Sequence, residues 1–179
     1  MMFRILLVCA LVGAGSALSC RWMERKYQEY RDSSLAQLNA MANNTISINS
    51  TEDYEDAVTF PNELYNQASK AVAEERLRFV VQLLEEIFAL FDGEDQTFVS
   101  WQEMAVDDFL NVITQQADGL LASCVSITSH KKSHRKMSMY FKRLALHVLE
   151  EMEHSADAWE LIREQVRLHI YRAQRLAEA

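Results

Sequence analysis

Apolar side chains recur every three or four positions in five separate stretches of the chain, and this period predicts five amphipathic helices. The stretches cover about residues 21–41, 68–91, 101–124, 136–153 and 157–178. The clearest stripe belongs to the second predicted helix and consists of Leu77, Val80, Leu84, Ile87 and Phe91. Only four glycines and one proline occur among the 179 residues, a scarcity typical of helical proteins. The sequence therefore predicts an all-α fold.

The other four predicted helices carry core-facing stripes of their own. The stripe of the first helix is Trp22, Tyr27, Tyr30, Leu35, Leu38 and Met41. The stripe of the third is Trp101, Ala105, Phe109, Val112, Leu120 and Cys124. The last two stripes are Met137, Phe141, Leu144, Val148 and Met152, then Trp159, Ile162, Val166, Ile170 and Ala173. Capping boxes, in which two side chains satisfy free amides at a helix start, are predicted for Ser100 with Glu103 and Asp157 with Glu160.

Loop lengths predict how the helices are connected. Residues 43–60 are polar, acidic and rich in serine and threonine, so they are predicted to form one long connection that ends at Pro61. An extended chain reaches about 3.3 Å per residue, enough here to span the ~30 Å length of a 20-residue helix. The other connections are short and favour antiparallel neighbours. The helices are thus expected to run up, up, down, up, down. We therefore expect a five-helix bundle, with an up-up-down-down four-helix core, a long overhand first loop and an extra helix.

Residues 1–19 are typical of a secretory signal peptide. Arg4 provides a short basic region, residues 5–15 are apolar, and residues 17–19 form a small-x-small cleavage site. We therefore expect this segment to be removed and the protein to be secreted as one extracellular domain, residues 20–179.

The three cysteines fit export to an oxidising compartment. Cys9 lies in the predicted signal peptide, which leaves Cys20 and Cys124 to form one disulfide. The predicted topology brings these two residues to the same end of the bundle. Asn43 and Asn49 each begin an N-glycosylation sequon in the long connection, as expected for a surface loop of a secreted protein.

The charge of the chain limits its partners. It has 18 basic and 26 acidic residues, a formal net charge of −8. A surface this acidic argues against nucleic acid or an anionic membrane as the main partner. Apart from the signal peptide, no segment approaches the roughly 18–20 apolar residues that a membrane span needs, so no membrane insertion is expected.

The sequence lacks the motifs of common catalytic sites. It has no nucleotide-binding loop, no G-x-S-x-G and no H-E-x-x-H. His130 and His134 are four apart, but they lie in a predicted basic loop without the further ligands that a metal needs. This His130–Arg135 loop is a candidate for weak binding of a sulfated glycan. We expect no enzyme activity and no cofactor, and surface or boundary positions for His147, His154 and His169.

Two segments near the C-terminus resemble the signature of type I interferons. Residues 140–143 read Y-F-K-R and residues 155–163 read S-A-D-A-W-E-L-I-R. The family has Y-F-x-R-x-x-L followed by S-x-C-A-W-E-x-x-R. Asp157 stands where mammalian members carry a cysteine of a second disulfide, so the chain is similar to the two-cysteine interferons of fishes, and we expect Asp157 to cap the last helix instead. Further matches in the same order are Phe60-Pro61, Asn66-Gln67, the segment from Ile87 to Phe91, Trp101 and Phe109.

The resemblance implies that the five-helix bundle is a cytokine bundle, and that the protein is an antiviral cytokine that brings together two class II cytokine receptor chains. By the same resemblance, Arg163 matches a receptor-contacting arginine of the last helix, followed on the same line by Arg167 and Tyr171, an exposed ridge typical of binding hot spots. Phe88 falls where the family has an aromatic used by the second receptor chain, although its position also fits the core. Two alternatives stay open. One is another helical cytokine, interleukin-10-like or type III interferon, and the other is a secreted helical lipid carrier.

Overall fold

The computed structural model describes residues 20, 25–41, 59–92, 101, 103–125 and 134–178, and every regular element among them is a helix. The first helix covers residues 25–41. The others are α3 (Glu63–Lys70), α4 (Ala73–Phe91), α5 (Glu103–Cys124), α6 (Arg135–Arg143), the π-helix η1 (Leu144–Glu150) and α7 (Ala156–Glu178). The prediction of an all-α fold is confirmed.

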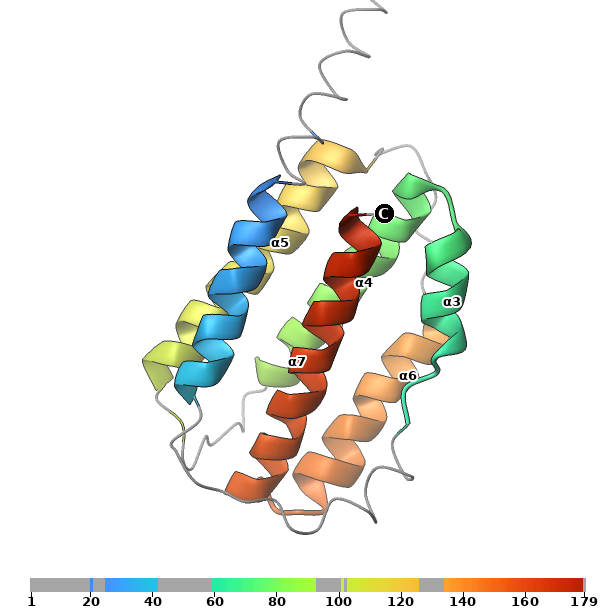
Figure 1. Ribbon diagram of the computed structural model, residues 1–179. Coiled ribbons are helices and arrows are strands. Elements are labelled where there is room, and N and C mark those ends of the chain that lie inside the picture. Colours follow the sequence, from blue (N-terminus) through green and yellow to red (C-terminus); the bar gives the residue numbers. More distant parts are fainter. Residues whose placement is uncertain are drawn as a thin grey trace, which may run out of the picture.

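The helices run in the predicted directions, as Figure 1 shows. The helix over residues 25–41, coloured blue to cyan, runs the same way as α4, and α5 returns in the opposite direction. The pair α6 and η1 then runs parallel to α4, and α7 runs back to end at the C-terminus. This is the order up, up, down, up, down. Most of the long connection, residues 42–58, lies outside the described residues.

Helix α4 is buried on nearly every side. Its residues 79–84 are all buried, including the polar Gln82. A helix that is apolar around its circumference belongs in the middle of a bundle. At one end of this core, the Trp159 ring of α7 lies 5.3 Å from Trp101 and 5.7 Å from Phe91, measured between ring centroids. Burying each large side chain stabilises the fold by about 1.5–3 kcal/mol.

The predicted stripes of α4 and α7 are buried at every position, and the others are buried with exceptions. Val112 is only partly buried, because its neighbour Ile113 faces the core instead. Trp22 lies outside the described residues. The predicted positions that are partly buried against the core are Tyr30, Leu35, Cys124 and Met152.

The prediction of a single helix over residues 68–91 is wrong at its start. Two helices occupy this region, because Ala71 and Val72 are extended, with ψ angles of 162° and 154°. Helix α3 buries Leu64 and Ala68, while Val72 at the corner is 67% exposed. The break therefore gives α3 a packing face that one straight helix would not provide.

The fourth predicted helix, residues 136–153, is not one regular α-helix. It begins as α6, continues as η1, and ends in a turn over residues 151–154. Glu153 and His154 in this turn have φ angles of 53° and 52°. Such left-handed residues are a common way to end a helix, and here they reverse the chain before α7.

Helix α7 is capped by Ser155, so the prediction that Asp157 is the N-cap is wrong. The backbone N–H of Ala158 donates to Ser155 Oγ at 3.3 Å, and the helix begins at Ala156. Asp157 lies exposed in the first turn, where its charge favours the positive end of the helix dipole. Ser100, from the other predicted box, lies outside the described residues.

Gln116 is a buried polar residue of α5 that weakens the core. It is 0% exposed, and neither its Oε1 nor its Nε2 has a hydrogen-bond partner within the described part of the chain. Leaving a buried polar group unpaired costs about 1–3 kcal/mol. We expect Gln116→Met, which keeps the length of the side chain, to raise the free energy of unfolding by about 1–3 kcal/mol in urea denaturation.

The neighbouring residue offers a matched control for this prediction. Gln115 lies on the same helix but is exposed. Gln115→Met should therefore change the free energy of unfolding by less than about 0.5 kcal/mol. A fall in stability for Gln116→Met would contradict the prediction.

Candidate functional site

Arg163, predicted on an exposed ridge of the last helix, lies instead in a buried network of charges. The residue is only 8% exposed. Its Nε donates to Glu160 Oε2 at 2.9 Å, and its Nη2 donates to Glu164 Oε1 at 2.9 Å and to Glu160 Oε1. The hydrogen bond to Glu160 raises the pKa of the guanidinium.

This network joins α7 to the first helix. Arg163 Nη1 donates to the backbone carbonyl oxygen of Leu38 at 3.5 Å. Leu38 belongs to the helix over residues 25–41 and is fully buried. Arg163 is therefore a brace between two helices, and the expectation that it is exposed is wrong.

Arg167 and Tyr171, in contrast, reach the surface. The Arg167 side chain is 38% exposed and Tyr171 is 46% exposed. Arg167 donates from Nε and Nη2 to Glu164 Oε2 at 2.9 Å and 2.5 Å, so Glu164 links it to the buried Arg163. Leu168, adjacent to Arg167, is 47% exposed. The exposed ridge of α7 is thus formed by Arg167, Leu168 and Tyr171. Arg167 is held in place by its bonds to Glu164, which also binds the buried Arg163.

Phe88 lies at the boundary of the core. It is partly buried and packs against the core residues, whereas its neighbour Ile87 is 0% exposed. Part of the Phe88 ring is therefore accessible on α4. Both of the roles considered from the sequence, core packing and contact with a partner, remain compatible with this position.

A second polar network, which the sequence did not predict, joins α4 to the start of α6. The backbone N–H of His134 donates to Gln82 Oε1 at 2.8 Å, and Gln82 Nε2 donates to Ser138 Oγ at 3.2 Å. The Ser138 hydroxyl in turn donates to Glu86 Oε1. Gln82 therefore satisfies a free backbone amide at the beginning of α6, as a helix cap does.

His169 is buried, so the expectation of a surface or boundary position is wrong. It is 2% exposed and lies between two tyrosines, with Nδ1 2.8 Å from Tyr65 Oη and Nε2 3.0 Å from Tyr140 Oη. Burial, together with the positive charge of the nearby Arg172, lowers the pKa of His169 to about 3. One ring nitrogen of the neutral imidazole donates and the other accepts, so both are satisfied. The residue connects α3, α6 and α7.

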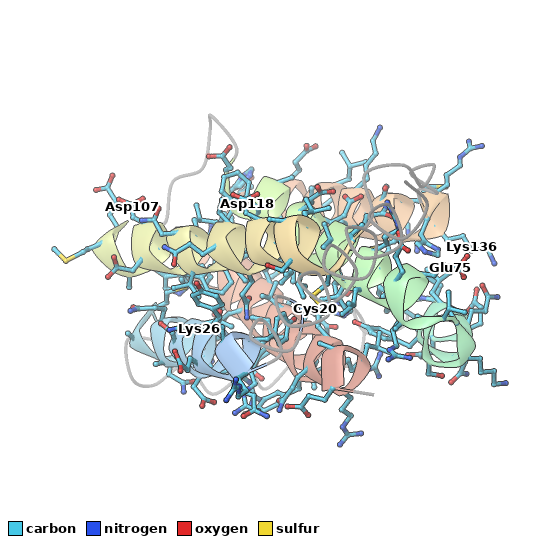
Figure 2. All side chains as sticks on the ribbon, turned by 90° about the horizontal axis from the view of Figure 1, so that it is seen from above. Cys20, Lys26, Glu75, Asp107, Asp118 and Lys136 are labelled. Carbon is cyan, nitrogen blue, oxygen red and sulfur yellow. A yellow bond between two sulfur atoms is a disulfide. The ribbon has the colours of Figure 1, made fainter. Side chains whose placement is uncertain are left out.

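Cys20 and Cys124 are joined by a disulfide in the structure, with their Cα atoms 4.8 Å apart. Figure 2 labels Cys20, with the yellow bond between the sulfur atoms beside it. The bond places Cys20 at the C-terminal end of α5. The predicted signal peptide, the sequons at Asn43 and Asn49, and residues 130–133 of the basic loop lie outside the described residues.

The described residues offer neither a metal site nor a membrane span. No group of three His, Cys, Asp or Glu side chains among them could hold a metal ion. None of the helices found there is both long and apolar enough to cross a membrane.

The chain is similar to known proteins over most of its length. The family model for the interferon alpha/beta domain matches residues 23–179. Interferon a3 of Oncorhynchus mykiss is 34% identical over 158 residues, which covers 88% of this chain and 85% of that protein. The solved structure of zebrafish interferon 1 is similar with a TM-score of 0.69 and 25% identity, covering 87% of this chain and 96% of that one.

Proposed function

The chain belongs to the interferon alpha/beta family, and from this we propose that it is a secreted type I interferon that binds two class II cytokine receptor chains. The kinases associated with those chains then activate transcription of antiviral genes, and the protein itself catalyses no reaction. The single observation that carries the proposal is the family match over residues 23–179. The similarity to two fish interferons supports it.

Other helical cytokines are the alternative to this proposal. Interleukin-10-like proteins and type III interferons share a helical architecture, so the fold alone does not separate them from type I interferons. The match to the interferon alpha/beta family favours the type I assignment.

We propose that the exposed ridge of α7 contacts one receptor chain. Arg167 and Tyr171 are of the residue types that dominate binding energy at protein interfaces. Arg163 positions this ridge from below, through Glu164, and does not contact the receptor with its full side chain. The exposed part of Phe88, on α4, is the proposed contact for the second chain.

Two arginine variants separate the brace from the contact. Arg163→Ala leaves Glu160 without its arginine and breaks the bond to Leu38, so it is expected to lower the free energy of unfolding by about 1–3 kcal/mol. Arg167→Ala leaves Glu164 paired with Arg163, so stability should change by less than about 0.5 kcal/mol. Its affinity for one receptor chain should fall by about 1–3 kcal/mol.

Urea denaturation measures the free energy of unfolding of both variants, and surface plasmon resonance measures their affinity for each receptor chain. The expected result is a loss of stability for Arg163→Ala and a loss of affinity for Arg167→Ala. If Arg163→Ala is as stable as the wild type, the brace is refuted. If Arg167→Ala binds both receptor chains with unchanged affinity, the proposed contact is refuted.

We also propose that residues 1–19 are cleaved, that the mature protein has one disulfide, and that the sequons at Asn43 and Asn49 are glycosylated. Peptide mapping of the protein secreted by eukaryotic cells tests all three. It should find Cys20 at the N-terminus, linked to a peptide that contains Cys124. Free thiols at both positions would contradict the disulfide.

The decisive test of function uses cells of the species that encodes the protein. Pretreatment with the purified mature chain should induce antiviral transcripts and reduce virus yield. Soluble ectodomains of the two receptor chains should block the effect when added in excess. Unchanged virus yield and no transcript induction, with a folded protein, would refute the proposal.

A further inference from the structure

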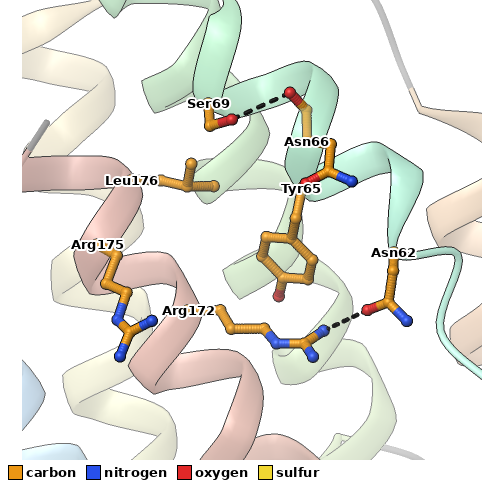
Figure 3. Close-up of a pocket in the computed structure, with 7 residues that line it drawn as sticks. All are labelled: Asn62, Tyr65, Asn66, Ser69, Arg172, Arg175 and Leu176. Carbon is orange, nitrogen blue, oxygen red and sulfur yellow. Dashed lines mark hydrogen bonds between the residues drawn. The ribbon is translucent and has the colours of Figure 1, made fainter.

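A pocket lined by polar and apolar side chains lies between α3 and the C-terminal half of α7, outside the ridge described above. Its volume is ≈ 360 Å³. Figure 3 shows the side chains that face it, with Asn62, which precedes α3, and Tyr65 and Ser69 of α3 opposite Arg172 and Arg175 of α7. Ligand pockets range from about 300 to 1,000 Å³, so this one is suited to a small group such as a side chain.

Arg172 is held in a fixed position at the edge of this pocket. Its Nη1 donates to Asn62 Oδ1 at 2.8 Å, and its guanidinium carbon lies 5.0 Å from the centroid of the Tyr65 ring. Tyr65 is itself fixed by the hydrogen bond between its hydroxyl and His169. A guanidinium that is already ordered by an amide and an aromatic ring loses little freedom when it binds an anion.

The pocket concentrates positive charge in an otherwise acidic protein. Arg175 follows Arg172 by three positions, one helical turn along α7, and also lines the pocket. Within the residues that the structure describes, neither arginine forms an ion pair and no carboxylate lines the pocket. Glu63, next to Asn62 in sequence, forms an ion pair with Lys136, with 3.0 Å between Glu63 Oε1 and Lys136 Nζ. Two guanidiniums without a counter-charge are the arrangement that recognises a carboxylate, sulfate or phosphate.

The size of the pocket and the charge of the whole chain decide among these anions. A net charge of −8 repels a polyanion such as a sulfated glycan at long range. A single carboxylate side chain experiences much less of this repulsion and fits the volume of the pocket. We infer that the pocket receives an aspartate or glutamate side chain of the receptor chain that contacts α7. This inference rests on the proposed function and adds a second contact point to it.

A charge-matched pair of double variants tests the inference. Arg172→Gln with Arg175→Gln removes both guanidiniums of the pocket, whereas Arg135→Gln with Lys142→Gln removes two exposed charges of α6. In surface plasmon resonance on both receptor ectodomains, the pocket variant should raise the Kd for one chain by about tenfold or more, mainly through faster dissociation. The α6 variant should change this Kd by less than about twofold, because it removes the same net charge without touching the pocket.

A double-mutant cycle then identifies the group that binds. Aspartates and glutamates of the receptor chain are changed one at a time to asparagine or glutamine, and each is combined with Arg172→Gln. One of these receptor variants should raise the Kd for the wild-type protein by about fivefold or more, and should leave the Kd for the Arg172→Gln protein unchanged. Circular dichroism and a melting curve of each variant show that the fold is retained.

Three outcomes would overturn the inference. In the first, the pocket variant binds both receptor chains with unchanged Kd, and in the second, the α6 variant weakens binding as much as the pocket variant does. In the third, a sulfated heparin oligosaccharide binds the wild type but not the pocket variant, while no receptor carboxylate couples to Arg172. If the wild type binds neither receptor chain, the proposed function itself fails, and the inference fails with it.

Discussion

Replacing Cys124 with serine is expected to lower the free energy of unfolding by about 4–5 kcal/mol, which is the largest effect of any substitution considered. Cys20 and Cys124 are 104 positions apart in sequence, so their bond closes a long loop and restricts the unfolded chain strongly. It also fixes Cys20 to the end of α5. Guanidinium denaturation of the non-reduced protein, followed by circular dichroism, measures the loss.

A second variant excludes effects of the unpaired thiol. Cys20→Ser with Cys124→Ser removes both sulfurs and should be destabilised by the same amount as the single variant. Adding a reductant to the wild type should bring its denaturation midpoint to that of the double variant. If the reduced wild type and both variants unfold at the same denaturant concentration as the oxidised protein, the disulfide does not stabilise the fold.

Hydrophobic periodicity alone predicted most of the bundle. The stripe positions of α4 and α7 are buried without exception, because in a helix whose core face spans several turns the period is repeated often enough to be unambiguous. The helix directions also followed from the sequence, since a long polar connection can cross the bundle and the short ones cannot. Helix positions and helix directions each depend on many residues, so one atypical side chain does not change the prediction.

The break between α3 and α4 could not be predicted in the same way. Residues 69–73 contain no glycine or proline, and their types favour a continuous helix. The extended conformation of Ala71 and Val72 is instead imposed by tertiary packing, in which α3 buries Leu64 and Ala68 and Tyr65 meets His169. Local preferences of a few tenths of a kcal/mol per residue are easily overridden by such contacts.

The errors at Arg163 and His169 share one feature. Arg163 was placed on the surface by the resemblance to a receptor-contacting arginine and His169 by default for a scattered histidine, although both lie beside the apolar stripe of α7. Arg163 is four positions after Trp159 and three before Val166, and His169 is three after Val166 and four before Ala173. Positions three and four apart share a helix face, so this spacing was a signal of burial. A polar residue at the edge of such a stripe is a candidate for a buried hydrogen-bond network.

The cap of α7 shows how closely spaced signals compete. Ser155 and Asp157 are both good N-cap residues, and only Asp157 has an acidic residue three positions later. That spacing favoured the wrong residue. The structure begins the helix two positions earlier, at Ala156, where the Ser155 hydroxyl accepts from the backbone of Ala158.

The buried His169 is expected to make the protein less stable in acid. Its pKa in the folded state is about 3, well below the ordinary value of 6.5. As the pH falls from 6.5 toward 3, the unfolded chain binds a proton at this residue while the folded chain does not, so the equilibrium shifts toward unfolding. The stability linked to His169 is therefore fully present above pH 6.5 and is lost as the pH falls toward 3, a change on the order of 4 kcal/mol.

The groups that face the imidazole explain why protonation is costly. Tyr65 and Tyr140 occupy its two nitrogens, and Arg172 adds a nearby positive charge. A protonated imidazole would have to donate to both tyrosines, next to the guanidinium and out of contact with water. His169→Gln removes the titrating group and keeps an amide that can donate and accept, so this variant should lose less stability on acidification than the wild type does.

The comparison is made by urea denaturation at pH 7.5 and at pH 4, where carboxylates common to both proteins contribute equally and cancel. His147→Gln is the control. The side chain of His147, in η1, is exposed and bonded to Glu151 in the turn that follows η1. This variant should follow the wild-type pH dependence, because it leaves the buried imidazole of His169 in place. If wild type and His169→Gln lose the same stability between the two pH values, the imidazole between Tyr65 and Tyr140 is not held neutral by the fold.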